Sequence, residues 1–420
     1  MTAPKLRFKE FDGNWDIYAL EDQIDFLAGY AFDSKLMSND IQKYQLIKMS
    51  NVYQNQLDLT RNSSYWEKID KKTEKFLLKK GDIVLTLTGT VGKTDYGYNV
   101  EIKENDKFLL NQRLVRLRGK IDFSLSKFVQ YRISTDKFFY HFFNSSKGGT
   151  GNQSNVSIED LKLLELSFPS KAEQTKIATF LSAVDEKINQ LTQKHQLLSQ
   201  YKQGMMQKLF SQQIRFKADD GSEFGAWESK KLNEIGQSFN GLVGKSKEDF
   251  GEGEAYITYK QIFDHRKINL NNVNFVNIQP NDTQNMVKKG DLFFTTSSET
   301  AHEVAYCSAI LDDFEFPLYL NSFCFGYRPN SANILNSIYA SFYFRSEIFR
   351  NKIKHLAQGS TRFNISKTAF MNVVIHLPML EEQTKIANFL SSIDQKIDVV
   401  SDQIEQAKQW KKGLLQQMFV

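Results

Sequence analysis

One hexapeptide occurs twice in this chain, and it sets the period of the whole sequence. Residues 173–178 and residues 382–387 both read E-Q-T-K-I-A. Gln174 and Gln383 therefore lie 209 positions apart (383 − 174). The same offset relates Pro169 to Pro378, Phe180 to Phe389, Leu181 to Leu390, Asp185 to Asp394, Lys187 to Lys396, Gly204 to Gly413 and Phe210 to Phe419. A period this long is too large for a solenoid, so the sequence predicts two copies of one whole unit, each ending in the same element.

That shared element has the pattern of a long helix. Apolar residues recur at positions a and d over five heptads in each copy, which is typical of a coiled coil. Ser170 followed by Glu173 resembles a capping box, and Pro169 precedes it at the expected helix entrance. Forty helical residues would form a rod of roughly 60 Å. The heptad positions are Ile177, Val184, Leu191, Leu198 and Met205 (a) with Leu181, Ile188, His195, Lys202 and Leu209 (d) in the first copy, and Ile386, Ile393, Val400, Ala407 and Leu414 (a) with Leu390, Ile397, Ile404, Lys411 and Met418 (d) in the second.

A lone helix of this length would leave its apolar stripe in water. We expect the two copies to pack on each other as an antiparallel coiled coil, because each helix closes its own globular unit and this packing places the units at opposite ends. Burying about fifteen aliphatic side chains would contribute on the order of 20 kcal/mol before entropy is counted. Two alternatives stay open: each helix packs on its own domain, or the seam binds another protein. We interpret His195, Lys202 and Lys411 on the seam as snorkelling or register-setting side chains.

The overall composition places limits on the class of protein. With 420 residues the chain can form two or three domains with real cores. No apolar run approaches the length of a membrane span, and the first residues carry charge rather than a signal sequence, so we expect a cytoplasmic protein. Cys307 and Cys324 form no C-x-x-C motif, which predicts two buried thiols rather than a disulfide or a zinc site. A net charge of +5 permits nucleic-acid binding without demanding it.

Each copy begins with a related segment and continues as a strand-rich body. Leu6-Arg7-Phe8-Lys9 opens the first copy, and Ile214-Arg215-Phe216-Lys217 opens the second directly after the first long helix, with Trp15 and Trp227 following. A K-K-G-D turn precedes an apolar strand at residues 79–82 and again at residues 288–291. The predicted strands are 47–53, 83–85, 114–118 and 163–168 in the first copy, and 256–263, 292–294, 323–327 and 373–377 in the second.

The bodies also contain helices and polar loops. One amphipathic helix rich in Phe and Tyr is predicted in each, at residues 126–144 and 333–356. Each helix leads to a Gly/Ser-rich loop, at residues 147–155 and 358–364. The long helices match closely, whereas the bodies match only in outline. We interpret this as two related readers on a common spacer.

Patterns that carry catalytic chemistry are incomplete in this sequence. Residues 89–94 read G-T-V-G-K-T but lack the glycine that a P-loop needs five positions before Gly92. Asp95, Glu101 and Lys103 resemble the carboxylates and lysine of a metal-dependent nuclease, but the second copy does not repeat them. The six histidines show no metal-ligand spacing. No N-P-P-Y or D-P-P-Y motif of an amino-methyltransferase occurs. The sequence predicts no catalytic residue and no metal site.

What remains are surfaces suited to DNA. Gly-rich loops beside Lys and Arg offer backbone N–H groups and charge for phosphates, and Asn, Gln, Ser and Arg can read base edges. The alternative is that these segments are ordinary turns at strand edges. The candidate DNA-binding residues are Thr88, Thr90, Lys93, Lys147, Thr150, Asn152 and Gln153 in the first unit and Thr296, Ser297, Ser298, Ser360, Thr361, Arg362 and Asn364 in the second.

The doubled layout resembles a known family over essentially the full length of the chain. The paired P-x-x-x-E-Q-T-K-I-A blocks, the paired K-K-G-D turns and the G-M-M-Q-K-L-F sequence at residues 204–210, followed by I-R-F-K, resemble the specificity (S) subunit of type I restriction-modification systems. The resemblance implies an α+β fold: two globular, strand-rich target recognition domains joined by two long helices, packed as an antiparallel coiled coil with an internal pseudo-twofold repeat.

The resemblance also implies a division of labour. Residues 1–168 and 213–376 would each read one half of a gapped site in double-stranded DNA, and residues 169–212 and 377–420 would set the distance between the halves. The long helices would dock two methylation (M) subunits, which restriction (R) subunits join. S-adenosylmethionine and ATP with Mg²⁺ would bind in those partners, so this chain itself would hold no cofactor. Base-contacting residues do not carry over, because recognition domains of this family diverge widely.

Two other classes compete with this interpretation. A coiled-coil scaffold that binds only proteins would show no salt-sensitive affinity for DNA. A nuclease or methyltransferase in its own right would be active as the isolated chain and would lose activity when Glu101 or Lys103 is replaced.

Overall fold

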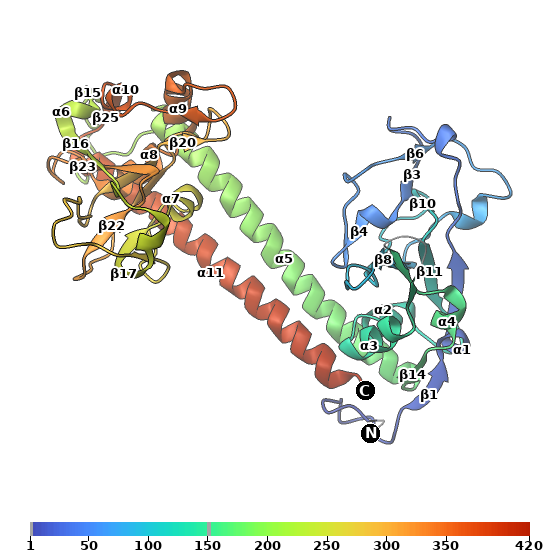
Figure 1. Ribbon diagram of the computed structural model, residues 1–420. Helices are drawn as coiled ribbons and strands as arrows, with labels where there is room; N and C mark the ends of the chain where they lie inside the picture. The colour runs from blue at the N-terminus through green and yellow to red at the C-terminus, as the bar shows by residue number, and fades with distance from the viewer. Residues whose placement is uncertain (1–2, 149–152) are drawn as a thin grey trace. The chain divides into compact units, whose positions relative to one another are not determined.

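The computed structural model describes residues 3–148 and 153–420 (Figure 1). Its internal contacts divide the chain into two units. Unit 1 comprises Met1–Leu191 and Asp402–Val420, and unit 2 comprises Thr192–Ser401. Each unit therefore contains one strand-rich body together with half of each long helix. This division cuts across the helices, whereas the segments predicted from sequence begin and end with them.

The repeated sequence forms two long helices, α5 (Lys171–Phe210) and α11 (Leu380–Met418). Their predicted seam is largely buried, as the 3.5-residue period requires. The seam residues that are at most 8% exposed are Ile177, Leu181, Val184, Leu191 and Leu209 on α5 and Ile386, Leu390, Ile393, Val400, Ile404, Leu414 and Met418 on α11. No helix in the described ranges is long and apolar enough to cross a membrane.

The two helices run antiparallel within each unit. In unit 1, Asp185 in the first half of α5 forms a 2.6 Å ion pair with Lys411 near the end of α11. In unit 2, Lys202 near the end of α5 pairs with Asp394 near the start of α11. The two aspartates and the two lysines are each 209 positions apart (394 − 185 and 411 − 202), so one contact is made twice. The predicted antiparallel coiled coil is confirmed, and the two seam lysines fix its register.

The body of unit 1 is built from small sheets. A four-stranded antiparallel sheet has the order β2-β11-β7-β9, a three-stranded sheet has the order β10-β3-β6, and another has the order β12-β13-β8. Short antiparallel pairs join β1 to β14 and β4 to β5. The strands are β1 (Asp16–Ala19), β2 (Ile24–Ala28), β3 (Tyr44–Ile47), β4 (Val52–Tyr53), β5 (Gln56–Leu57), β6 (Tyr65–Trp66), β7 (Ile83–Thr86), β8 (Thr88–Thr90), β9 (Asn99–Glu101), β10 (Phe108–Leu110), β11 (Leu114–Gly119), β12 (Lys147–Gly148), β13 (Gln153–Asn155) and β14 (Glu165–Phe168).

The body of unit 2 repeats this topology. Its four-stranded sheet has the order β16-β23-β19-β21, its three-stranded sheet has the order β18-β17-β22, and the pairs are β15-β25 and β20-β24. The two bodies, which match only in outline in sequence, thus share their main sheets, whereas among the described residues β4-β5 has no counterpart in unit 2 and β20-β24 has two strands where β12-β13-β8 has three. The strands are β15 (Glu228–Lys231), β16 (Gly236–Asn240), β17 (Phe250–Ile257), β18 (Asn274–Val276), β19 (Leu292–Thr295), β20 (Ser297–Ser298), β21 (Cys307–Ala309), β22 (Leu318–Leu320), β23 (Cys324–Pro329), β24 (Phe363–Asn364) and β25 (Val374–Leu377).

Each predicted amphipathic helix is in fact two helices. Residues 126–144 form α2 (Ser126–Arg132) and α3 (Asp136–Asn144), and residues 333–356 contain α8 (Ser337–Tyr343) and α9 (Glu347–Ile353). The breaks arise because Thr135 and Ser346 cap the second helix of each pair, each accepting a hydrogen bond from the backbone N–H three residues later. The short helices α1 (Leu20–Gln23), α4 (Ile158–Lys162), α6 (Leu232–Ile235), α7 (Tyr259–Asp264) and α10 (Lys367–Met371) complete the bodies.

Two predicted strands are also corrected by local side-chain hydrogen bonds. The segment 256–263 is strand only as far as Ile257, because Thr258 accepts a hydrogen bond from the backbone N–H of Gln261 and starts α7. The segment 47–53 contains a turn between β3 and β4, since the Asn51 amide oxygen accepts from the backbone N–H of Lys48 at 2.9 Å. Both loops predicted as Gly/Ser-rich contain strand residues, in β12, β13 and β24.

The glutamine of the repeated hexapeptide fastens each long helix to its own body. Gln174 accepts a hydrogen bond from the backbone N–H of Leu125 at 3.0 Å and donates to the carbonyl of Phe123 at 3.0 Å. Gln383 accepts from Asn336 at 2.9 Å and donates to the carbonyl of Ile334 at 3.0 Å. Both glutamines are 1% exposed. The repeated motif is therefore a buried connection between helix and body.

The paired K-K-G-D turns also have a structural role. Asp82 accepts from the backbone N–H of Lys79 at 2.8 Å, and Asp291 accepts from that of Lys288 at 2.7 Å. Each carboxylate also binds an arginine of the neighbouring strand, Arg118 in unit 1 and Arg328 in unit 2. Gly81 and Gly290 both have φ of 87°, a conformation that glycine adopts without the penalty other residues incur.

Candidate nucleic-acid interface

The predicted contact residues of unit 1 lie mainly on one small sheet. In β13, Gln153 lies opposite Thr90 and Asn155 lies opposite Thr88, while Lys147 of β12 lies on the other side of Asn155. Residues opposite each other across antiparallel strands, and residues two apart on one strand, share a face of the sheet. These five side chains therefore belong to one face, which we call the β8–β13 face.

Unit 2 presents the corresponding surface in the same register. Ser297 of β20 lies opposite Asn364 of β24, and Gln358 pairs with the other side of Asn364. Ser297 follows Thr88 by 209 positions (297 − 88), and Asn364 follows Asn155 by the same number (364 − 155). We call the face formed by Ser297, Gln358 and Asn364 the β20–β24 face.

The predicted contact residues differ in accessibility. Three hydroxyl side chains, those of Thr88, Ser297 and Ser298, are buried. Thr88 donates its hydrogen bond to the Asn155 amide oxygen at 3.0 Å, so its hydroxyl is used within the protein. Thr90 and Thr296 are half-buried, and the exposed predicted residues are Lys93, Lys147, Gln153, Ser360, Thr361, Arg362 and Asn364. The predicted residues Thr150 and Asn152 lie outside the described residues.

Acidic side chains lie beside the β8–β13 face. Asp95 accepts hydrogen bonds from the backbone N–H of Thr90 at 2.8 Å and from its hydroxyl at 2.7 Å. The backbone hydrogen bond above all holds the pKa of Asp95 below its usual range. Lys147 forms an ion pair of 2.9 Å with Asp160. The positive charge of Lys147 is thus partly balanced by Asp160. This balance weakens non-specific attraction to a polyanion and favours ligands that supply matching hydrogen bonds.

Three hydrogen bonds hold β20 and the residues that follow it. The Tyr259 hydroxyl donates to the carbonyl of Ser297 at 2.6 Å. The Ser298 hydroxyl donates to the Glu303 carboxylate at 3.2 Å, and the Thr300 hydroxyl donates to the same carboxylate at 2.8 Å. Asn364, on the partner strand β24, is exposed.

Sequence reasoning missed two exposed residues that flank these faces. The carbonyl of Arg113 accepts a hydrogen bond from the N–H of Leu87, and the carbonyl of Phe323 accepts from the N–H of Thr296. Both residues end a turn, at equivalent positions 210 apart (323 − 113). Arg113 has φ of 67°, a left-handed conformation that costs a non-glycine residue roughly 1–3 kcal/mol and occurs preferentially at functional sites. The dipeptides N-Q and N-S, which interrupt the apolar runs just before Arg113 and Phe323, were the available signal.

Two glycines allow these turns to lie close to the neighbouring strand. A Cβ on Gly29 would lie 1.9 Å from the carbonyl oxygen of Asn111, and a Cβ on Gly241 would lie 2.1 Å from that of Asn321. The backbone at Asn111 or Asn321 could make room for a Cβ only if the whole turn moved. Gly241 is therefore required at this position for steric reasons.

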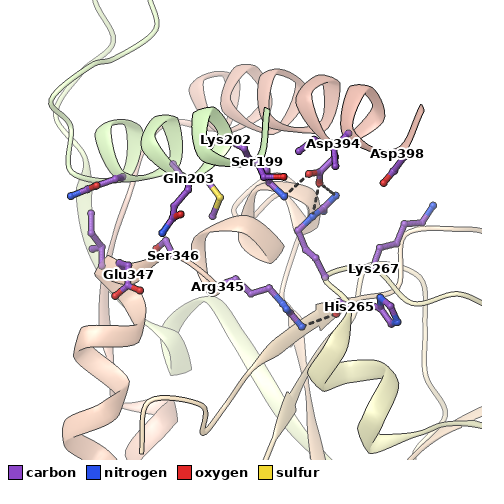
Figure 2. Close-up of a pocket in the computed structure, with 15 residues that line it drawn as sticks. Ser199, Lys202, Gln203, His265, Lys267, Arg345, Ser346, Glu347, Asp394 and Asp398 are labelled. Atoms are coloured by element: carbon purple, nitrogen blue, oxygen red, sulfur yellow. Dashed lines mark hydrogen bonds and ion pairs between the residues drawn. The ribbon is translucent and has the colours of Figure 1, made fainter. Parts of the chain in front are cut away.

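A cavity of about 660 Å³ lies in unit 2 between the long helices and the body (Figure 2). Most of its charged groups have partners within the protein. Asp394 binds Lys202 and Arg266, and Lys267 binds Asp312. Arg345 donates to backbone carbonyls that include that of His265. The cavity is thus lined by contacts that fasten the coiled coil to its body.

The carboxylates considered for a nuclease site are otherwise engaged. Glu101 forms ion pairs with Lys103 and Lys127. Burial raises the pKa of Glu101, but the two lysines outweigh burial and hold it below its usual range. Within residues 3–148 and 153–420, no group of three or more His, Cys, Asp or Glu side chains is placed to hold a metal ion.

Comparison with known proteins places this architecture in a family. Residues 12–199 and residues 225–409 each match the family described as "Type I restriction modification DNA specificity domain". The chain is 26% identical to the specificity subunit assigned to the type I restriction enzyme MjaX of Methanocaldococcus jannaschii, over 98% of this chain and 94% of the relative. It is 24% identical to the type I restriction enzyme MjaVIII specificity subunit of the same organism, over 97% of this chain and 94% of the relative.

Solved structures share the fold. The S subunit of a type I restriction-modification system from M. genitalium superposes with a TM-score of 0.57 at 18% identity, over 100% of this chain and 99% of that chain. A chain from a structure that describes complex assembly and conformational transition of the type I R-M system gives a TM-score of 0.54 at 14% identity, with 96% of each chain covered. The two sequence matches cover most of the chain and coincide with the two bodies and their helices. The chain therefore belongs to the type I restriction modification DNA specificity domain family, and it carries the family's domain twice.

Proposed function

We propose that this chain is the sequence-reading subunit of a type I restriction-modification complex and that it reads a gapped site in double-stranded DNA. Residues 1–168 read one half of the site and residues 213–376 the other. The observation that carries the proposal is the equivalence of the β8–β13 and β20–β24 faces. One backbone arrangement presents different side chains in each unit, as expected of two readers for two short sequences.

The long helices dock the partners of the complex. Tyr201 on α5 and Trp410 on α11 lie at equivalent positions, 209 apart (410 − 201). They are 51% and 54% exposed, although large aromatic side chains are usually covered in a complete assembly. Two equivalent exposed aromatic residues suit two copies of one partner, the methylation subunit. Restriction subunits join that core.

The chemistry resides in those partners. Methyl transfer from S-adenosylmethionine to adenine and ATP-driven cleavage with Mg²⁺ take place in the methylation and restriction subunits. This chain supplies recognition and carries no catalytic residue. Its role is to hold the partners at one sequence, through base contacts in two half-sites about one helical turn apart, or ~34 Å.

The proposal is tested by methylome sequencing. Cells express this chain with its neighbouring methylation subunit, and two control strains express each protein alone. The expected result is a split motif, with two short defined halves and a fixed gap, methylated only when both proteins are present. Replacing residues 1–168 with another recognition domain should change one half only. If the purified pair binds no DNA and methylates none, the chain is a protein-interaction scaffold.

A further inference from the structure

Almost every arginine in unit 2 is committed to holding the protein together. Two donate to backbone carbonyls of their own body, and three bind carboxylates. Arg345 donates to the carbonyls of Ile262, Phe263, His265 and Cys307, and Arg350 donates to those of His302, Val304 and Ala305. The three ion pairs join Arg215 to Glu382, Arg266 to Asp394 and Arg328 to Asp291.

Arg362 is the exception among the described arginines of this unit. It is exposed, and its guanidinium makes no hydrogen bond and no ion pair within residues 3–148 and 153–420; only its backbone carbonyl accepts a hydrogen bond, from Asn364. A guanidinium offers five N–H donors in a planar fork. The five donors of Arg362 therefore have no partner among the described residues, whereas each of the other five arginines of the unit donates to protein acceptors from at least two guanidinium nitrogens.

The backbone that presents Arg362 is held in one conformation. Gln358 and Asn364 exchange two backbone hydrogen bonds of 2.8 Å, and the N–H of Ile365 donates to the carbonyl of Thr296 at 3.0 Å. We call residues 358–364 the Gln358 hairpin. Gly359 has φ of +125°, and a Cβ there would lie 2.2 Å from the carbonyl oxygen of Arg362. The glycine lets the chain turn tightly, so the hairpin holds the Cα of Arg362 beside the β20–β24 face.

The surroundings of Arg362 favour a base over a phosphate as its ligand. The Gln358 hairpin reads Q-G-S-T-R-F-N, so Arg362 is its single charged residue, and its Gln, Ser, Thr and Asn side chains supply neutral hydrogen-bonding groups. Surfaces that follow a phosphate backbone gather several cations, whereas base reading uses single forks of fixed orientation. The guanidinium fork matches the O6 and N7 acceptors of guanine, the commonest specific contact of arginine in the major groove.

We infer that Arg362 reads a guanine in the half-site that unit 2 recognises, by donating two hydrogen bonds to O6 and N7 in the major groove. The inference rests on the proposed function and specifies it. It predicts that this half-site contains a G·C pair at one position. It also assigns unit 1 a different contact, because the residue 209 positions before Arg362 is Gln153 (362 − 209) and not an arginine.

The experiment compares the complete complex carrying the natural chain, Arg362→Ala or Lys289→Gln. Lys289→Gln is the matched control, because it also removes one positive charge from an exposed side chain of unit 2. Lys289 lies in the turn just before the first residue of β19. Methylome sequencing gives the motif of each complex. Binding competition with four duplexes, which differ only at the expected G·C pair, measures discrimination. The half-site that persists when residues 1–168 are exchanged is the one that unit 2 reads.

The expected result is a G·C pair in that half-site and loss of its recognition in Arg362→Ala. The natural complex should prefer the G·C duplex by ~10- to 100-fold, and Arg362→Ala by less than threefold, with the other half-site and the gap unchanged. Lys289→Gln should keep the full preference. A uniform loss of affinity for all four duplexes would mean a phosphate contact and would overturn the inference. So would a half-site without a G·C pair. Both outcomes leave the split motif intact, whereas failure of the proposed function would remove it from the natural complex as well.

Discussion

Arg7 and Glu173 form a two-point ion pair, with Nε to Oε1 and Nη2 to Oε2 both at 2.7 Å. The Glu173 side chain is 1% exposed and also accepts a hydrogen bond from the indole N–H of Trp15 at 3.3 Å. Arg215 and Glu382 repeat the arrangement in unit 2. The start of each copy is thereby tied to the start of its long helix. The expected capping box is wrong in one half: the Ser170 hydroxyl accepts from the N–H of Glu173, but the Glu173 carboxylate binds Arg7 instead.

Removing one partner of this ion pair should destabilise unit 1. Arg7→Met leaves a buried carboxylate without its cation, so we expect the free energy of unfolding to fall by roughly 3–5 kcal/mol. Urea unfolding at neutral pH measures this change. Glu405→Gln is the control, because it breaks an exposed pair with Lys408 and should cost less than about 1 kcal/mol. The double variant Arg7→Met with Glu173→Leu should recover part of the loss, since no unpaired charge remains; an equal or larger loss would contradict this account.

The long-range features of the fold could be predicted from the sequence because they depend on periodicity. The heptad pattern located α5 and α11, and the strict offset between copies predicted that one arrangement would occur twice. The failures were local. Thr135, Ser346 and Thr258 cap helices through their hydroxyls, and a hydroxyl within an apolar stretch reads the same in sequence whether it caps a helix or lies inside one.

The candidate site was predictable only in part. Glycines and polar residues marked the segments around Gln153 and Arg362, and strand register then placed Asn155 and Gln358 on the same faces. Register depends on partners far along the chain, so sequence alone did not supply it. Arg113 was missed because nothing in its sequence neighbourhood reveals a positive φ.

Arg113 offers a test of whether backbone strain serves recognition. Arg113→Asn should raise the free energy of unfolding by several tenths to about 1 kcal/mol, because asparagine tolerates the left-handed region better than arginine. The same change should weaken binding of the complex to its DNA site by about tenfold, through loss of a contact near the β8–β13 face. Urea unfolding and a binding titration measure the two effects. Lys80→Gln, which removes an exposed charge of the same unit, should change neither appreciably; unchanged DNA binding by Arg113→Asn would remove it from the interface.

The two cysteines should make stability depend on alkaline pH. Cys307 is fully buried, and burial raises the pKa of its thiol from 9.0 to about 12. Burial also raises the pKa of Cys324. Between pH 9 and 12 the unfolded chain loses the Cys307 proton while the folded chain keeps it, so stability falls as pH rises, by up to ~1.4 kcal/mol per pH unit. Below pH 9 this thiol contributes no pH dependence.

Unfolding of the natural chain and of Cys307→Ala at pH 8 and pH 10.5 tests the sign and the window. The loss of stability between these values should be smaller in Cys307→Ala, even though the variant is less stable at pH 8 because it leaves a small cavity. An equal loss of stability in both proteins would contradict this account. It would mean that the Cys307 thiol has the same pKa in the folded and the unfolded chain.

The boundary between the units crosses both long helices, after Leu191 in α5 and after Ser401 in α11. Seven residues inserted at both points preserve the heptad register of each unit, including the Asp185–Lys411 and Lys202–Asp394 pairs. Each insertion lengthens its helix by ~10 Å, so we expect the gap of the methylated motif to grow by about three base pairs while both half-sites stay the same. Methylome sequencing of the double insertion measures the gap. Insertion into α5 alone places one helix out of register with the other and should abolish methylation; an unchanged gap in the double insertion would show that the helices do not set the spacing.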